Sequence, residues 1–161
     1  MTTGMDQVGI RPLRDEDASA LFEMMRDPEA VRMAAFTAPD PDDRAAFDAH
    51  LARIRATPGV RNFAVEQGGE LVGMVAAFDQ EGDREVTYWI DRRWWGRGIA
   101  RRALALLLEV EPVRPLAARA AAHNLGSIRV LEANGFVEVG REVAYADGVG
   151  AEIPEAIFVL R

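Results

Sequence analysis

The chain has 161 residues, of which 49% are hydrophobic and 28% are charged. This balance predicts one folded domain, residues 1–161, and excludes a disordered chain. The formal net charge of −7 argues against a nucleic-acid partner, and the absence of cysteine excludes thiol nucleophiles, disulfides and thiolate metal sites. No stretch is apolar enough for a signal peptide or a membrane span, so we expect a cytoplasmic protein with no membrane partner.

Every basic residue is Arg, and these residues are unevenly spread. The lack of Lys fits a compositional bias, since Ala is also abundant, and it excludes Schiff-base chemistry on Lys. Residues 1–91 hold 18 Asp and Glu against 9 Arg. A cluster of five Arg follows at once: Arg92, Arg93, Arg97, Arg101 and Arg102. Such local positive charge in an acidic chain predicts a small anionic ligand.

The first third of the chain predicts a strand followed by two helices. Residues Ile10–Leu13 form a short strand whose proline places it at a sheet edge or a bulge. Asp15 is the expected N-cap of an amphipathic helix that ends near Asp27–Pro28. The prolines in residues 28–40 predict a loop with about one helical turn. A second helix runs from Asp42 to about Ala56, with its apolar residues on one stripe.

The remainder predicts strands and two further helices. The helices are the strongly apolar segment Ile99–Val110 and the shorter segment Ser127–Ala133. Six segments bounded by turn residues are predicted strands: Asn62–Glu66, Glu70–Phe78, Arg84–Asp91, Leu116–Ala122, Phe136–Tyr145 and Ile153–Leu160. This order of elements predicts an α/β (α+β) fold with a mixed, mostly antiparallel sheet.

A glycine turn joins the strand Arg84–Asp91 to the helix Ile99–Val110. Gly96 and Gly98 lack a Cβ, so the backbone turns tightly there and a ligand can approach closely. The first N–H groups of a helix have no internal partner and lie at the positive end of its dipole, where they bind anions. The turn is therefore a candidate pyrophosphate site, although two glycines also serve in a plain strand-to-helix connection.

Two other phosphate-binding motifs fail at this turn. The dinucleotide fingerprint needs a third glycine three residues after Gly98, where the chain has Arg101. It also needs an acid about twenty residues further on, and residues 116–118 contain none. The Walker loop needs Gly-Lys followed by Ser or Thr, and the chain has no Lys.

The segment Trp95-Gly96-Arg97-Gly98-Ile99-Ala100 resembles the acetyl-CoA signature of GNAT N-acetyltransferases, Arg/Gln-x-x-Gly-x-Gly/Ala. Two more segments agree in order and spacing with the RimJ/RimL-like branch of that superfamily. Residues 85–90, Glu-Val-Thr-Tyr-Trp-Ile, resemble its Glu-Ile-Gly-Tyr-Trp strand. Residues 124–136 resemble its Asn-x-x-Ser-x-Arg-Val-Leu-Glu-Lys-x-Gly-Phe segment. With residues 10–13, Ile-Arg-Pro-Leu, the resemblance covers nearly the whole chain.

This resemblance implies a GNAT fold with about six to seven strands, about four helices, and fourth and fifth strands that splay apart. Acetyl-CoA is the implied co-substrate, and no metal is expected. The resemblance implies that Ile90 and Arg92 contact the pantetheine arm through their backbone and that Asn124 hydrogen-bonds it. The implied pyrophosphate contacts are the residues of the glycine turn: Trp95, Gly96, Arg97, Gly98, Ile99, Ala100 and Arg101.

Acetyl transfer to an amine needs a base for the amine proton and benefits from an acid for the departing thiolate. With the resemblance, Glu85 is the candidate base, acting directly or through water. Many GNAT members carry a tyrosine acid where this chain has Leu131, so Ser127 becomes the candidate acid and Tyr88 the second choice. A plain strand carboxylate at Glu85 and a plain helix-terminal serine at Ser127 are the structural alternatives.

The sequence leaves the acceptor and the assembly open. Strict alternation places Glu85, Thr87 and Trp89 on one face of their strand unless a bulge changes the phase. His50 and His123 are expected to be structural. The expected partner is an amine acceptor (a protein N-terminus, polyamine, amino acid or aminoglycoside-like amine), and the chain is a monomer or a homodimer. The alternative function is a GNAT-like domain that binds acyl-CoA only to sense it; the carboxylate of Glu85 favours the enzyme.

Overall fold

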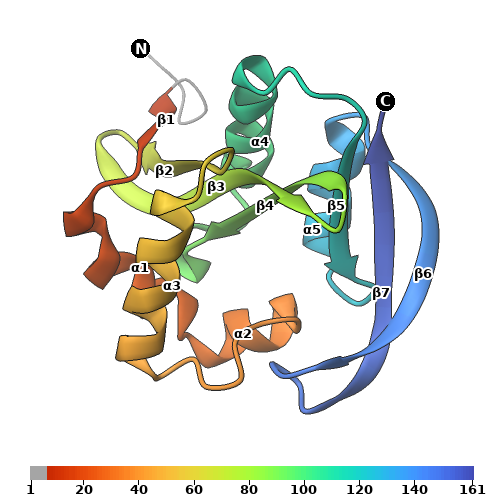
Figure 1. Ribbon diagram of the computed structural model, residues 1–161, viewed down its shortest axis with the longest axis horizontal. Helices are drawn as coiled ribbons and strands as arrows, with labels where there is room; N and C mark the ends of the chain where they lie inside the picture. Colours follow the sequence, from red (N-terminus) through yellow and green to blue (C-terminus); the bar gives the residue numbers. More distant parts are fainter. Residues whose placement is uncertain (1–6) are drawn as a thin grey trace.

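A computed structural model describes residues 7–161 of the chain (Figure 1). The helices are α1 (Ala18–Met25), α2 (Pro28–Ala34), α3 (Arg44–Ala56), α4 (Ile99–Val110) and α5 (Leu125–Ala133). The strands are β1 (Val8–Pro12), β2 (Arg61–Gln67), β3 (Glu70–Gln80), β4 (Asp83–Ile90), β5 (Leu116–Ala121), β6 (Val137–Ala146) and β7 (Ala151–Leu160). Two short 3₁₀ turns, Asp15–Asp17 and Arg92–Trp94, precede α1 and follow β4.

The seven strands form one sheet in the order β1-β2-β3-β4-β5-β7-β6. Every neighbouring pair is antiparallel except β4 and β5. Those two strands run parallel and pair only at Arg84 with Leu116 and Glu85 with Ala117. Beyond Glu85 they separate, which leaves an opening in the middle of the sheet. The predicted mixed α/β fold and the predicted splay of the fourth and fifth strands are confirmed.

Each face of the sheet carries its own apolar core because helices cover both sides (Figure 1). On one face, α4 and α5 bury Leu104, Leu107 and Leu131 against the sheet. On the other face, α1 and α3 bury Leu21 and Leu51 against β3. Alternate residues of a strand point to opposite faces, so the central strands β2, β3 and β4 contribute to both cores.

Strand β4 follows this alternation along its whole length. Val86 and Ile90 belong to the core under α4 and α5, whereas Trp89 packs with the core under α1 and α3. The pairing of β3 with β4 runs without a shift of register, so no bulge changes the phase. Glu85 and Thr87 therefore face the α1/α3 side together with Trp89, as predicted.

Most predicted elements of the second half lie within two residues of their expected bounds, whereas two predictions near the N-terminus are wrong. Asp15 is not the N-cap: the carboxylate of Asp17 accepts the backbone N–H of Arg14 at 2.8 Å, and Asp15 pairs with Arg55. The expected loop at 28–40 contains the seven-residue helix α2. Proline is compatible with the first position of a helix, where its missing N–H has no bond to make.

Candidate active site

The glycine turn between β4 and α4 has the backbone geometry that the sequence predicts. Gly96 and Gly98 both have φ of +76°, in the left-handed region that favours glycine, and Gly98 is the N-cap of α4. A Cβ at Gly96 would meet no atom within 4 Å. The turn is therefore open on the side from which a ligand would approach.

Six consecutive backbone amides of this turn, Gly96 to Arg101, donate no hydrogen bond to any residue in the range 7–161. The next amide, Arg102, bonds to the carbonyl of Gly98 at 3.1 Å. Trp95 differs from the rest of the turn, because its amide donates to the carbonyl of Arg92 at 3.2 Å and its indole Nε1 to that of Ile90 at 2.8 Å. The donors available to an anion thus begin at Gly96.

Two of the five clustered arginines already pair with carboxylates of the protein, so fewer positive charges are available to a ligand than the sequence suggests. Arg92 pairs with Asp27 at 2.7 Å and with Glu29 at 3.0 Å, and Arg93 pairs with the neighbouring Asp91 at 2.7 Å. The guanidinium of Arg97 lies 4.7 Å from the ring centroid of Trp94. Within the described part of the chain, Arg97, Arg101 and Arg102 have no carboxylate partner. Three of the five charges therefore remain uncompensated at the start of α4.

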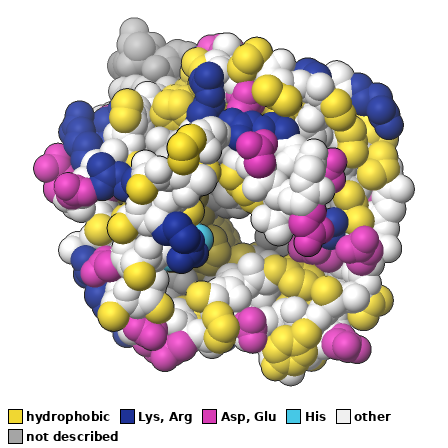
Figure 2. Space-filling view, viewed as in Figure 1, with side chains coloured by type: hydrophobic (Ala, Val, Ile, Leu, Met, Phe, Trp, Pro, Cys, Tyr) yellow, Lys and Arg dark blue, Asp and Glu magenta, His cyan; other side chains and the backbone are white. Residues whose placement is uncertain are grey.

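The opening between β4 and β5 leads into a cavity of about 510 Å³ that both faces of the sheet line. Tyr88, Asn124 and Ser127 line it from the α5 side, and Glu85 and Trp89 line it from the α1/α3 side. The space-filling view is hollowed near its centre at this place, with acidic side chains gathered to the right of the hollow (Figure 2). The cavity thus brings both predicted catalytic residues, Glu85 and Ser127, into one space.

Glu85 lies at the point where β4 and β5 separate, and its side chain is 12% exposed. Its carboxylate is 3.7 Å from Nε of Arg119 on β5 and accepts no hydrogen bond from residues 7–161. Burial raises the pKa of Glu85 above its ordinary value, and the nearby Arg119 only partly opposes this rise. A weakly solvated carboxylate with a raised pKa is a stronger base than an exposed one.

Arg119 is shared among three carboxylates, which the sequence analysis missed. Besides Glu85, its guanidinium contacts Glu142 at 2.9 Å and Glu155 at 3.2 Å. Glu142 and Glu155 are directly opposite each other in the ladder of β6 and β7, where like charges repel, so Arg119 holds them together. The one available signal was a single charged residue within an alanine-rich strand, Leu-Ala-Ala-Arg-Ala-Ala.

Across the opening, Tyr88 and Ser127 form a hydrogen-bonded pair. The hydroxyl of Tyr88 lies 2.7 Å from Oγ of Ser127 and also donates to the carbonyl of Ser127 at 3.1 Å. Burial raises the pKa of Tyr88 to about 12, although the bond to Ser127 opposes the rise. Leu131 is fully buried in the core. The two candidate acids, which the sequence treated as alternatives, therefore form one unit.

Asn124 is the N-cap of α5: its Oδ1 accepts the amide of Ser127 at 3.2 Å. Its Nδ2 donates no hydrogen bond within residues 7–161, and the residue lines the cavity. His123 makes a structural contact: its Nε2 lies within hydrogen-bond distance, 3.1 Å, of the backbone carbonyl of Arg32. His50 lines the cavity, with Nδ1 2.7 Å from a guanidinium nitrogen of Arg53.

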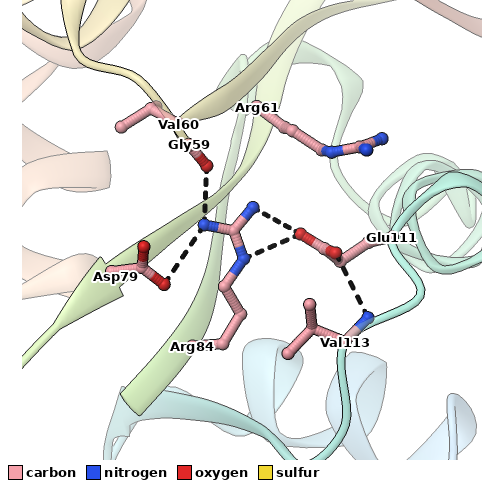
Figure 3. Close-up of a pocket in the computed structure, with 7 residues that line it drawn as sticks. All are labelled: Gly59, Val60, Arg61, Asp79, Arg84, Glu111 and Val113. Atoms are coloured by element: carbon pink, nitrogen blue, oxygen red, sulfur yellow. Dashed lines mark hydrogen bonds and ion pairs between the residues drawn. The ribbon is translucent and has the colours of Figure 1, made fainter. Parts of the chain in front are cut away.

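A second cavity, of about 430 Å³, is lined by a closed polar network (Figure 3). Arg84 donates to one carboxylate oxygen of Glu111 at 2.8 and 2.5 Å, and to the carbonyl of Gly59 at 2.6 Å. The other carboxylate oxygen of Glu111 accepts the amide of Val113 at 3.3 Å. Every charged group in this network has its partners, so the first cavity is the better candidate for chemistry.

The model of the acetyltransferase (GNAT) domain family matches residues 7–137. The chain belongs to this family. The GNAT membership that the sequence predicted is thus confirmed, and acetyl transfer is the general chemistry that it supports. Among curated proteins, no sequence matches this chain.

Solved structures with the GNAT fold resemble the chain along almost its whole length. RimJ of Mycobacterium smegmatis, in complex with CoA-disulfide, has a TM-score of 0.79 at 24% identity, covering 95% of this chain and 81% of that one. RimL, a ribosomal L7/L12 alpha-N-protein acetyltransferase in complex with coenzyme A, has a TM-score of 0.77 at 16% identity, covering 96% and 93%. The acetyl-CoA complex of yncA from Salmonella typhimurium has a TM-score of 0.72 at 19% identity, covering 96% and 94%. These likenesses show the fold and accord with the predicted branch.

Two further findings concern residues 7–161. None of their helices combines the length and the apolar character that crossing a membrane requires. They also contain no group of three or more His, Asp or Glu placed to hold a metal ion.

Proposed function

We propose that this GNAT domain transfers the acetyl group of acetyl-CoA to a primary amine, by direct attack while both substrates are bound. The observation that carries the proposal is the cavity at the β4–β5 opening, which Tyr88 and Ser127 line from the α5 side and Glu85 lines from the α1/α3 side. The free amides lie at the start of α4, the helix that packs on β4. A thioester entering from the α4/α5 side and an amine entering from the α1/α3 side would meet in this opening.

The residues present fit a nucleotide-linked thioester. The six free amides from Gly96 to Arg101 would hold the pyrophosphate, with Arg97 and Arg101 adding positive charge. The N–H of Asp91 donates to Val72, so Tyr88 and Ile90 direct their backbone groups away from β3, towards the opening. The proposed contacts of the pantetheine amides are these groups, the backbone of Arg92 and Nδ2 of Asn124. At Ile90 the contact is the N–H, because its carbonyl already accepts the indole N–H of Trp95. Trp95, whose own amide is engaged, would contribute its partly exposed ring.

Glu85 is the proposed base. Its carboxylate takes the proton of the acceptor ammonium, directly or through a water molecule, and the freed amine nitrogen forms a bond to the thioester carbonyl carbon. The raised pKa of Glu85 brings its proton affinity closer to that of an amine. Because Glu85 faces the α1/α3 side, it lies on the side from which the acceptor would come.

Ser127 is the proposed acid. As the carbon–sulfur bond breaks, its hydroxyl gives a proton to the departing thiolate and regains one from solvent. Tyr88, whose pKa is about 12, stays protonated at neutral pH, and its hydroxyl, 2.7 Å from Oγ of Ser127, would donate to Oγ once Ser127 has given up its proton. That bond stabilises negative charge on Ser127 Oγ, so Tyr88 assists an acid that would be weak by itself.

The test is binding and turnover measured side by side. Acetyl-CoA should raise the melting temperature, because it binds only the folded state, whereas NADH and ATP should not. With an accepted amine, free thiol should appear in step with acetylated amine. Tight binding without turnover of any amine would instead support the acyl-CoA-sensing alternative.

Gly98→Val tests the binding site itself. Valine is strained at a φ of +76° and its side chain would crowd the free amides, so acetyl-CoA binding should be lost. Gly140→Val is the matched control, because Gly140 lies in β6 with open space around its Cβ position. An unchanged dissociation constant for a folded Gly98→Val variant would place the cofactor elsewhere.

A further inference from the structure

Apolar side chains that are only partly buried line the α1/α3 side of the cavity, the side from which the acceptor would enter. Six of them are half-buried and come from α1, α3, β3, β4 and the segment after α2: Met25, Phe36, Phe47, Ile54, Phe78 and Trp89. Four of the six are aromatic. The ring of Phe47 is fixed in place by an edge contact with the buried Phe22, at 5.4 Å between centroids. This wall is therefore a preformed apolar surface beside the catalytic opening.

The charged groups that line this side are predominantly acidic. Asp40 and Asp43 lie at the end near α3, and Glu85 and Glu155 lie near the opening. The one guanidinium that lines the cavity, that of Arg119, is shared by Glu85, Glu142 and Glu155. When all three ionise, the cluster has an excess of negative charge, so it attracts an ammonium group and repels a carboxylate.

We propose that the acceptor is a small primary amine carried on an aromatic-sized apolar body, with no carboxylate beside the amine. This inference rests on the proposed acetyl transfer and names the substrate class of the same site. The ammonium would lie at Glu85, and the body would lie against the wall that includes Phe47 and Ile54. A cavity of about 510 Å³ has the size of a small-molecule site, which is typically apolar with a few placed polar groups.

A peptide N-terminus fits this wall less well than a small amine. Each peptide unit brings an N–H and a C=O that need partners when they leave water. Six apolar side chains supply none for them. The indole N–H of Trp89 and the hydroxyl of Thr37 have no hydrogen-bond partner among residues 7–161, but both atoms lie below the surface, out of reach of a peptide backbone. An arylalkylamine has a single polar group, which Glu85 would satisfy.

In the reaction, the acceptor ammonium loses one proton to Glu85, and its nitrogen forms a bond to the acetyl carbonyl carbon. The same nitrogen loses a second proton to solvent as the amide forms. The carbon–sulfur bond of the thioester breaks, and its electron pair leaves on sulfur, which takes a proton. The products are the N-acetyl amide and the free thiol of CoA. No oxidant, reductant or metal enters this balance.

The experiment compares amines that differ by one feature each. 2-Phenylethylamine against ethylamine isolates the ring, and L-phenylalaninamide against L-phenylalanine isolates the carboxylate. We expect kcat/KM to be about tenfold to hundredfold higher with the ring, the range that burying one aromatic side chain gives. We expect L-phenylalanine to be at least about tenfold poorer than its amide, because its carboxylate would approach Glu85 and Glu155.

Variants of the wall test whether it is the source of this selectivity. Phe47→Ala should reduce the ratio of kcat/KM for 2-phenylethylamine to kcat/KM for ethylamine, chiefly by raising KM for the larger amine. Phe63→Ala is the matched control, because Phe63 is half-buried in β2 and packs on the other face. If Phe47→Ala does not fold, Ile54→Ala removes part of the same wall at a lower cost.

The charge term has its own pair of variants. Glu155→Gln should narrow the gap in kcat/KM between L-phenylalanine and its amide. Glu152→Gln, at an exposed position of the same strand, should leave that gap unchanged. Equal rates with ethylamine and 2-phenylethylamine, or preference for a serine-initiated peptide or for putrescine, would overturn the inference and leave acetyl transfer intact. If CoA binds and no amine reacts, the proposed function itself fails.

Discussion

Arg84 and Glu85 are neighbours in the chain, point to opposite faces of β4, and have opposite surroundings. The guanidinium of Arg84 is 10% exposed, bonds twice to the fully buried carboxylate of Glu111 and once to a backbone carbonyl. Glu85 is similarly covered, but among residues 7–161 its only charged contact is Arg119 at 3.7 Å. Arg119 itself bonds more closely to two other carboxylates.

This difference separates a charge that holds the fold from one that remains available for chemistry. The partners of Arg84 join the strand to the end of α4 and to the turn before β2 (Figure 3). Losing the carboxylate of Glu111 would leave the buried charge of Arg84 uncompensated. Glu85 lacks such partners, and its burial therefore raises its pKa instead. A proton acceptor with raised proton affinity beside an opening is what amine deprotonation requires.

Glu85→Gln should have the largest effect on turnover. Loss of a positioned base lowers kcat by roughly 10²–10⁴-fold, while acetyl-CoA affinity should stay the same because the glycine turn is untouched. The loss should shrink as pH approaches the pKa of the acceptor amine, since free amine then forms without help. Steady-state rates against pH, with CoA binding measured on the same preparations, check this. Wild-type rates at neutral pH would make Glu85 a plain strand carboxylate.

The same substitution should not destabilise the protein at neutral pH. The folded-state pKa of Glu85 is raised, so its contribution to stability is fully present below the unfolded pKa and is lost as pH rises through the folded pKa. Glutamine cannot ionise and avoids that loss. The difference in melting temperature between variant and wild type should therefore favour the variant more at pH 7 than at pH 4.

Glu111→Ala should show the reverse pattern, with a large effect on stability and a small one on chemistry. Removing one partner of a buried pair costs about 3–5 kcal/mol, because Arg84 is left buried without its carboxylate. Denaturant unfolding measures this loss. Asp79→Ala is the control, since Asp79 is 72% exposed and 3.4 Å from Arg84, and it should change stability by less than about 1 kcal/mol. In the folded fraction of either variant, kcat should stay near wild type.

The sequence predicted only part of the difference between Arg84 and Glu85. Strand alternation predicted that the two residues point to opposite faces, and the GNAT resemblance predicted Glu85 as the base. The partners were not predictable, because Glu111, Arg119, Glu142 and Glu155 are brought in by tertiary pairing of distant segments. A run of arginines in the sequence likewise suggested more free charge than the folded chain has, since Arg92 pairs with Asp27 from the start of α2.

The N-terminal region shows the same division between local and tertiary information. Helix α4 begins and ends where its apolar periodicity and glycine turn predict. The prolines of residues 28–40 predicted a loop with about one helical turn. Pro28 instead occupies the first position of the seven-residue helix α2, which Asp27 caps. The acceptor wall includes residues of this N-terminal region. Which side chains form the wall is therefore known only from the folded structure.

Arg119→Gln should give the smallest and most specific effect. Arg119 lowers the pKa of Glu85 against the effect of burial, so its removal should raise that pKa further. Glu142 and Glu155 also lose the cation that they share. Their negative charges are then uncompensated, which raises the pKa of Glu85 as well. The acidic limb of kcat/KM, where Glu85 becomes protonated, should therefore move to higher pH. Rates above that limb should remain close to wild type, because Glu85 and Ser127 are unchanged.

The measurement is a pH profile with one acceptor amine for all enzymes, so that the pKa of the amine affects each profile equally. Arg119→Lys is the matched control, because it keeps the positive charge near Glu85 and should leave the limb close to that of wild type. A limb that stays in place in the glutamine variant would show that Arg119 serves only to hold Glu142 and Glu155 together. A limb that moves to lower pH would contradict Glu85 as the titrating base, since no loss of a neighbouring cation lowers the pKa of a carboxylate.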